Sequence, residues 1–231
     1  MCGRFVSTTP AADLAEHFGA TGVSGSLPPR WNVAPSSEVW VVHDGGSDAG
    51  GVAPQSTRVL EPMRWGLVPS WAHDPAVGNR MINARAETAG AKPSFRAAFR
   101  RRRCVVPVDG FYEWAAVPGQ RAKQAWYLTS GDGEKPLALA GLWEEGHDGV
   151  PRTCTILTTA ADEVVSPIHH RMPVALPADV VDVWLDPAVT ERTAVEHLLA
   201  GVVPPTLRCR RVGSAVGNPR NDGPGLLDPV A

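Results

Sequence analysis

The pattern of apolar and polar positions along this chain predicts a few short helices. Residues 11–18 follow a Thr-Pro pair, precede Gly19, and place Leu14 and Phe18 on one helical face. Residues 94–103 and 190–200 also read as helices, and Gly201 is typical of the residue that ends one. We therefore expect short helices separated by long non-helical stretches.

Short apolar runs of strand length make up much of the remaining chain. Strands are predicted at residues 38–43, 104–108, 125–129, 137–142, 154–158 and 173–176. Many short strands with a few helices between them favour an α+β fold, with a mixed, mainly antiparallel sheet or partly closed barrel and a few flanking helices. We read residues 1–231 as a single domain, with a surface loop at 45–57 and a flexible tail at 222–231.

Composition places the chain among water-soluble globular proteins. Its 231 residues are 43% hydrophobic and 20% charged. No run approaches the roughly 18 consecutive apolar residues of a membrane span, and the first residues are too polar for a signal peptide. We therefore expect a cytoplasmic protein with no membrane contact.

Charge and cysteine usage narrow the possible chemistry. The net charge is −2, yet only three of the 22 basic residues are lysines and the rest are arginines. Arginine suits phosphate groups, but a GC-rich genome is the simpler explanation of the bias, so a nucleic-acid groove is permitted without being required. The cysteines lack zinc-ligand spacing, so we expect no metal and no cofactor. Cys104, Cys154 and Cys209 are expected to be buried, reduced thiols.

Cys2 differs from the other cysteines because loss of Met1 would leave an amine and a thiol on adjacent carbons. Such a group condenses with an aldehyde through its amine, and the thiol then closes onto the imine carbon to form a thiazolidine. A terminal amine has a pKa of about 8 against about 10.4 for lysine, so it is neutral roughly a few hundred times more often at pH 7. Taken alone, Cys2 is more simply a small residue after the start codon.

A series of short, unusual segments changes that interpretation. They are residues 2–5 (CGRF), 31–35 (WNVAP), 64–71 (RWGLVPSW), 82–88 (INARAET), 103–114 (RCVVPVDGFYEW), 140–144 (AGLWE), 157–161 (LTTAA), 168–173 (IHHRMP) and 216–218 (VGN) with Asn221. In this order they resemble the SOS-response-associated peptidase (SRAP) family of abasic-site processing proteins. The resemblance spans nearly the whole chain. One departure is Ala72, where the family often has a second aromatic residue.

The resemblance implies covalent chemistry at four residues. Cys2, after loss of Met1, would bond to the ring-opened deoxyribose of an abasic site in single-stranded DNA and shield the strand from cleavage. Asn83 would position the amine, Glu113 would handle protons during imine formation, and His169 would help to open the sugar ring. Schiff-base formation needs a neutral amine, an acid and a base, so these residue types suit this lyase-like chemistry.

Further residues near these segments are predicted to contact DNA. They are Arg4, Trp71, Arg85, Trp114, Arg171, Asn218 and Asn221. The three arginines stand within two residues of a proposed catalytic residue, where a phosphate clamp would belong, and an aromatic side chain can stack on bases. The run of arginines at 100–103 is interpreted as a solvated helix end.

Other functions fit some of the same residues. An N-terminal-nucleophile cysteine peptidase would attack an amide with the Cys2 thiol, and removal of Met1 could itself be autocatalytic. A noncovalent reader of modified DNA would use Cys2 only structurally. For the favoured function the expected partner is single-stranded DNA with abasic sites, bound by a monomer that associates with the nucleoid.

Overall fold

The computed structural model describes residues 2–44, 58–131 and 136–230. The helices are α1 (Ala11–Phe18), α2 (Ala86–Ala89), α3 (Arg96–Arg101), α4 (Ala178–Leu185) and α5 (Arg192–Ala200), with 3₁₀ helices η1 (Pro75–Arg80), η2 (Ser214–Gly217) and η3 (Pro224–Leu227). No helix in these ranges is long and apolar enough to span a membrane. The helix predicted at residues 11–18 has the bounds of α1.

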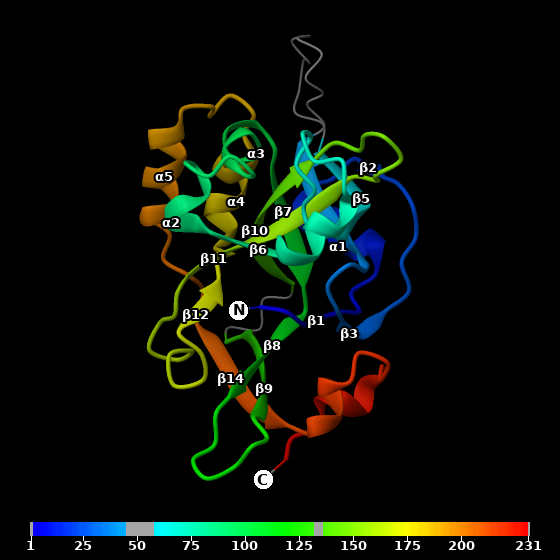
Figure 1. Ribbon diagram of the computed structural model, residues 1–231, viewed down its shortest axis with the longest axis vertical. Helices are drawn as coiled ribbons and strands as arrows, with labels where there is room; N and C mark the ends of the chain where they lie inside the picture. Colours follow the sequence, from blue (N-terminus) through cyan, green and yellow to red (C-terminus); the bar gives the residue numbers. More distant parts are fainter. Residues whose placement is uncertain (1, 45–57, 132–135, 231) are drawn as a thin grey trace.

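The strands form two sheets (Figure 1). The larger sheet contains β2 (Gly22–Val23), β4 (Glu38–Asp44), β5 (Arg58–Trp65), β6 (Asn83–Arg85), β7 (Arg103–Val108), β10 (Leu137–Glu144), β11 (Thr153–Ala160), β12 (Arg171–Pro173) and β13 (Ala175–Leu176). The smaller sheet contains β1 (Phe5–Ser7), β3 (Arg30–Val33), β8 (Gly110–Ala115), β9 (Gln124–Ser130) and β14 (Leu207–Val212).

Part of the larger sheet closes on itself as a ring. The antiparallel pairings run from β11 to β10, β7, β4 and β5. β5 then returns to β11 through a short parallel pairing, in which Arg64 lies opposite Thr153 and Trp65 opposite Cys154. The predicted α+β fold, mainly antiparallel and partly closed, is therefore confirmed.

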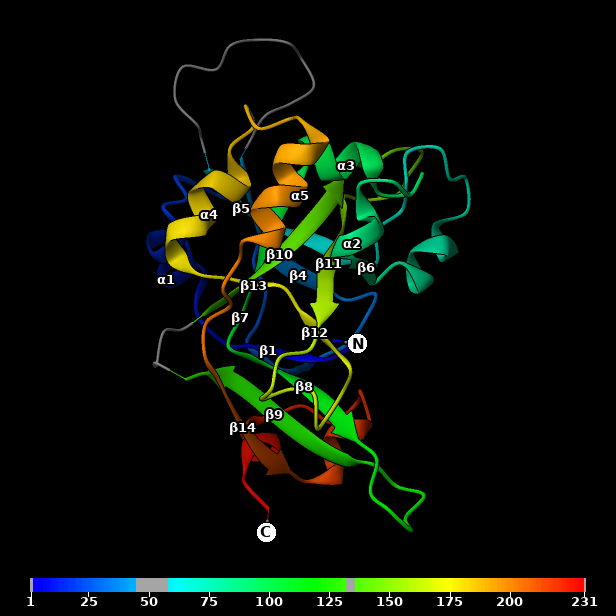
Figure 2. The ribbon, with the colours of Figure 1, turned by 90° about the vertical axis from the view of Figure 1, so that its left-hand side faces the viewer.

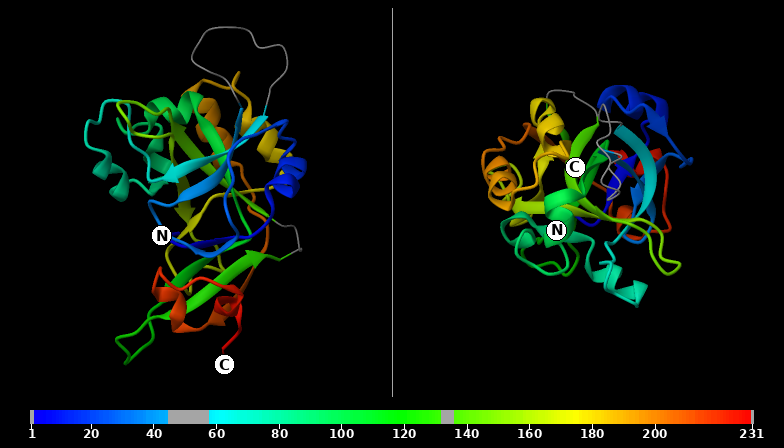
Figure 3. Two further views of the ribbon diagram at one scale, coloured as in Figure 1. Left: turned by 90° about the vertical axis from the view of Figure 1, so that its right-hand side faces the viewer. Right: turned by 90° about the horizontal axis from the view of Figure 1, so that it is seen from above.

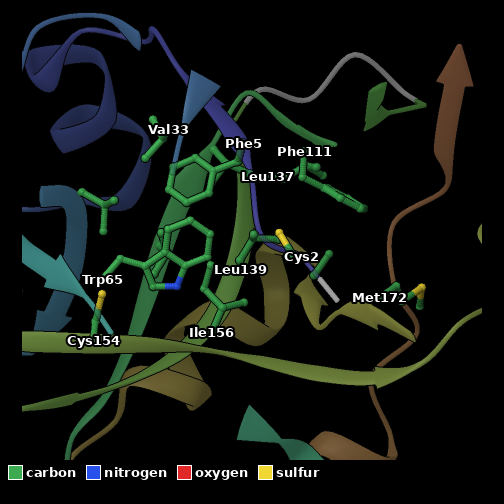
Figure 4. Packing of buried hydrophobic residues seen from close by; sticks show 14 of the residues in the cluster. Cys2, Phe5, Val33, Trp65, Phe111, Leu137, Leu139, Cys154, Ile156 and Met172 are labelled. Carbon is green, nitrogen blue, oxygen red and sulfur yellow. The ribbon is translucent and has the colours of Figure 1, made fainter. Parts of the chain in front are cut away.

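Successive residues of the ring strands belong to two different cores. In β7, Cys104 and Val106 pack in one cluster, whereas Val105 packs in the other. The second cluster also contains apolar residues of α1, α3, α4 and α5. Because side chains alternate between the faces of a strand, the first cluster fills the ring and the second lies under the helices. We call the first the ring core, and Figure 4 shows its buried residues around Trp65.

The smaller sheet packs against the ring with one face only. Phe111 of β8 and Leu128 of β9 belong to the ring core. Tyr112 and Tyr127, the next residues on the other side of β8 and β9, pack in a third cluster with Val216. Figure 3 shows the C-terminal segment beside these strands. The alternation along β8 therefore directs Glu113 to the same side as Phe111.

The C-terminal segment is fastened to β3. The side-chain amide of the fully buried Asn32 donates to the backbone carbonyls of Val216, Asn218 and Asn221 at 3.2, 3.1 and 2.9 Å. The carboxylate of Asp222 accepts from the backbone N–H of Trp31 at 2.6 Å. Farther along, apolar residues of η3 pack against the third cluster. These contacts argue against the flexible tail predicted at 222–231, and the loop predicted at 45–57 lies outside the described residues.

Two side chains lie where the sequence did not place them. Arg103, expected at a solvated helix end, begins β7 and is buried, and its guanidinium donates to the carbonyls of Trp184, Arg100 and Asp186. Burial lowers the pKa of Arg103 to about 10, which leaves it charged at pH 7. Cys209, expected to be buried, is exposed because β14 lies at the edge of the smaller sheet.

Candidate functional site

β6 brings Asn83 to Cys2. β6 runs parallel to β11, with Asn83 beside Ile156 and Ala84 beside Leu157. Ile156 belongs to the ring core with Cys2, whereas Ala84 and Leu157 belong to the core under the helices. Paired residues share a face, so Asn83 points towards Cys2, and its side-chain amide donates to the Cys2 carbonyl at 2.7 Å. Its Oδ1 atom is buried and has no hydrogen-bond partner in the described part of the chain.

Cys2 and Glu113 are both withdrawn from solvent. Cys2 is fully buried in the ring core, in the same cluster as Phe111, Leu139 and Met172 (Figure 4). Glu113 is 3% exposed and lies two residues after Phe111 in β8. Burial, and then the negative charge of Glu113, raise the pKa of the Cys2 thiol far above its usual value. The thiol is therefore protonated at neutral pH.

A compact turn before β12 carries His169. The side chain of Asp162 accepts from the backbone N–H of Val165 at 2.8 Å, and the backbone N–H of His169 donates to the Val165 carbonyl at 2.9 Å. Ile168 and Met172, on either side of His169, are buried in the ring core that contains Cys2. These anchors place the imidazole at the edge of that core.

The backbone of Arg171 holds the ring of His169. Nδ1 of His169 lies 3.0 Å from both the backbone N–H and the carbonyl oxygen of Arg171. Nδ1 accepts from the N–H in one neutral tautomer and donates to the carbonyl in the other, so these contacts fix the orientation of the ring and not the position of its proton. The ring of His170 stacks on that of His169, with centroids 4.4 Å apart. Desolvation and the neighbouring charges of His169, Arg171 and Arg85 lower the pKa of His170.

Arg171 is committed to the protein's own carboxylates and carbonyls. Its guanidinium binds Glu87 at 2.6 and 2.9 Å and donates to the Thr158 carbonyl at 2.5 Å. The hydrogen bonds from Arg171 hold the pKa of Glu87 below its usual value. Arg171 therefore braces α2, β11 and β12 together, and its role as a DNA contact remains a prediction.

Other predicted DNA contacts fasten the C-terminal segment. Arg4 donates to the side chain of Asn32 and to the carbonyl of Val216, both at 2.9 Å. The side chains of Asn218 and Asn221 bond to backbone groups of their own turn. The structure thus gathers Arg4, Asn218 and Asn221 in one network around Asn32.

The remaining predicted contacts differ in accessibility. Trp71 is 57% exposed, and Arg85 is also exposed, two residues beyond Asn83 on β6. Trp114 is half-buried and packs with the third cluster, on the opposite face of β8 from Glu113. Trp71 and Arg85 are therefore available to a ligand, whereas Trp114 faces away from the ring core.

Sequence reasoning gave no role to two residues that organise this region. Glu87 and Asn32 lie inside the INARAET and WNVAP segments, but a single sequence does not reveal the partners of a carboxylate or an amide. Within residues 2–44, 58–131 and 136–230, no group of three His, Cys, Asp or Glu residues could hold a metal ion.

Comparison with known proteins gives a consistent answer. The family described as SOS response associated peptidase (SRAP) matches residues 1–219. Abasic site processing protein YoqW from Bacillus subtilis is 36% identical over 99% of both chains, and YedK from Escherichia coli, of the same description, is 29% identical over 100% of both. A crystal structure of a protein from Bacteroides thetaiotaomicron matches with a TM-score of 0.80, covering 100% of both chains at 22% identity, which supports the fold alone. The chain belongs to the SOS response associated peptidase family.

Proposed function

We propose that this protein binds single-stranded DNA at abasic sites and joins Cys2 covalently to the ring-opened sugar. Two relatives that match over essentially their whole length are named abasic site processing proteins. The observation that carries the proposal is the convergence of Asn83 and Glu113 on Cys2, through a 2.7 Å hydrogen bond and a shared buried face.

The covalent step begins after hydrolysis of the Met1–Cys2 bond has released the Cys2 amine. The neutral amine attacks the C1′ aldehyde, and the resulting carbinolamine loses water with the help of an acid to give an imine. The thiol sulfur then attacks the imine carbon while its proton passes to the nitrogen. A five-membered thiazolidine results, water is the only product released, and no oxidant or reductant is required.

Each polar side chain has a distinct part in this proposal. Asn83 fixes the Cys2 backbone through its bond to the carbonyl and so orients the adjacent amine. Glu113, on the buried face beside the thiol, takes and returns protons. His169, whose ring is held by the backbone of Arg171, transfers protons at the sugar ring oxygen, which opens the hemiacetal to the reactive aldehyde.

The raised thiol pKa supports this order of events. In the chain that still carries Met1, the buried thiol stays protonated at neutral pH and is a weak nucleophile towards an amide, whereas peptidase cysteines have lowered pKa values. The amine therefore reacts first, and the thiol closes the ring only after the imine carbon lies beside it. The same feature makes a general cysteine peptidase the less supported alternative.

Incubation with an oligonucleotide that contains one abasic site tests the proposal. We expect a heat-stable shifted band on a denaturing gel from protein verified to begin at Cys2. Cys2→Ala and a chain with an uncleaved residue in front of Cys2 should give no such band, and Glu113→Gln should form it slowly. Absence of the band from the verified protein would refute covalent chemistry, and noncovalent binding retained by Cys2→Ala would then support a reader of DNA.

A further inference from the structure

α3 and α5 border a pocket lined almost entirely by arginines. Figure 2 shows the two helices next to each other. The lining residues are Gly90, Arg96, Ala97, Arg100, Arg101, Arg102 and Arg192. We call this the arginine pocket. It contains most of the run at 100–103, to which the covalent chemistry assigns no role.

Part of the charge in the arginine pocket is left uncompensated by the protein. The ion pairs are Arg100–Glu191, Arg102–Glu144 and Arg192–Glu196, at 3.8, 3.0 and 2.7 Å. Arg96 and Arg101 are exposed and form no ion pair or hydrogen bond with the described residues. Two guanidinium groups are therefore available to an anion from solution.

The position of Arg96 works against the local stability of α3. Arg96 is the first residue of α3, where a cation opposes the helix dipole, and it repels Arg100 four residues later on the same face, although Arg100 and Arg101 themselves lie in the last turn, where a cation is favourable. Gly90 lets the guanidinium of Arg192 approach, since a Cβ there would lie 3.2 Å from its Nε. An arrangement that opposes local preferences is typical of a binding site, where a ligand offsets the cost.

Two further pockets, each of which shares a lining residue with the one before, follow α5 from the arginine pocket towards Asp162. One neighbouring pocket shares Arg192 with the arginine pocket and continues past Glu196 to Thr159. A third shares Thr159 with that one and reaches Asp162 and Met172. Met172 packs in the ring core with Cys2, and Asp162 begins the turn that carries His169. The carboxylates along this path, Glu87 and Glu196, are each paired with an arginine.

We propose that the arginine pocket binds phosphodiester groups of the same DNA strand, a few nucleotides away from the abasic site; this inference rests on the proposed function. α5 borders these pockets along its length of about 13 Å, at about 1.5 Å per residue. Stacked phosphates rise about 3.4 Å each, so a phosphate directly next to the lesion does not extend along α5 to the arginine pocket. The planar guanidinium group of arginine can donate two hydrogen bonds to the oxygens of one phosphate, and five arginines line the pocket.

The test measures noncovalent binding to single strands that contain a tetrahydrofuran analogue, which lacks the aldehyde. One strand has about two nucleotides on each side of the analogue and the other about ten. We expect the double variant Arg96→Gln, Arg101→Gln to bind the long strand about 5- to 20-fold more weakly at low salt. The slope of the logarithm of the binding constant against the logarithm of the salt concentration should become shallower by about one to two. Binding of the short strand should stay the same.

A matched control removes two charges at the other end of the molecule. Arg121 and Lys123 are exposed on the hairpin between β8 and β9, which Figure 1 shows far from α3. Arg121→Gln with Lys123→Gln should not reproduce the length-dependent loss. Equal loss on both strands, or no loss on the long strand, would overturn the proposal.

A separate reaction distinguishes failure of this inference from failure of the proposed function. The double variant Arg96→Gln, Arg101→Gln and the wild type should form the covalent adduct equally on a short strand that contains a true abasic site. Absence of the adduct in both proteins would refute the covalent function, while the analogue measurements would still decide whether the arginine pocket binds the strand.

Discussion

The arginines of this protein fall into two groups, one bonded within the protein and one exposed to solvent. Near Cys2 and in the ring, Arg4, Arg171 and Arg103 donate to carbonyls and carboxylates of the protein itself. In α3, Arg96 and Arg101 are exposed and form no such bonds with the described residues. A buried cation must be paired or hydrogen-bonded, so the first group belongs to the architecture, and closeness to a motif does not by itself make an arginine available to DNA.

The largest expected effect is on stability at Arg103. Arg103→Ala would leave the carbonyls of Trp184 and Asp186 without their donor, so we expect unfolding to become easier by about 2–4 kcal/mol. Urea denaturation of both proteins measures this difference. Arg101→Ala is the matched control and should stay within about 0.5 kcal/mol of the wild type. A loss below about 1 kcal/mol for Arg103→Ala would remove the distinction between the two groups.

Arg4 should show an intermediate and more local effect. Arg4→Ala removes the bonds to Asn32 and Val216, which should cost about 1–2 kcal/mol. Amide hydrogen exchange should accelerate in η2 and in the turn that follows it, while the ring strands stay protected. Uniform acceleration across the whole protein would mean that Arg4 does not act specifically on the C-terminal segment.

The ion pair of Arg171 and Glu87 should affect chemistry more than stability. We expect Glu87→Gln to slow adduct formation about tenfold, because the backbone of Arg171 also holds the ring of His169. Arg171 lowers the pKa of Glu87, so the carboxylate stabilises the fold above its usual pKa of about 4.5, and this contribution is lost as pH falls through the lowered value.

Thermal unfolding between pH 3 and 7 tests whether the ion pair of Arg171 and Glu87 stabilises the fold. The stability difference between wild type and Glu87→Gln should be complete near neutral pH and should vanish in acid. A difference that does not shrink as the pH falls from 7 to 3 would contradict the ion pair as its origin. Adduct formation by Arg171→Lys, which keeps the charge but loses the two-pronged contact, should also be slower.

The smallest expected effect belongs to α3. Arg96→Gln removes a cation from the first turn and relieves its repulsion with Arg100, so the protein should be unchanged or more stable by a few tenths of a kcal/mol. Urea denaturation detects the sign. A clear loss of stability would show that Arg96 is bonded within the protein after all.

Apolar runs predicted the ring strands β7, β10 and β11, whose two faces are both covered, and periodicity predicted α1, but neither predicted β8. α1 was located correctly because its apolar residues lie four apart and a glycine follows. In β8, Phe111 and Tyr112 pack in two different clusters and Glu113 follows at once. Such a short aromatic run, interrupted by a carboxylate, matches neither the continuous nor the alternating strand pattern.

The candidate site shows a different limit of sequence reasoning. The resemblance named Asn83 and Cys2 together, but nothing in their local sequence indicates how they meet. The contact depends on the parallel pairing of β6 with β11, which places Asn83 beside Ile156 in the ring core. Long-range pairing of this kind depends on the whole fold, so single-sequence patterns do not contain it.

The short parallel pairing that closes the ring has a consequence for how the chain folds. β5 and β11 meet at only a few positions, Arg64 with Thr153 and Trp65 with Cys154, although a large part of the chain separates them. Loop-closure entropy must be overcome before such distant contacts contribute, so this seam should form late and limit the folding rate. In the folded protein, local opening of the ring should start at this β5–β11 pairing, and β11 also pairs with the strand that carries Asn83.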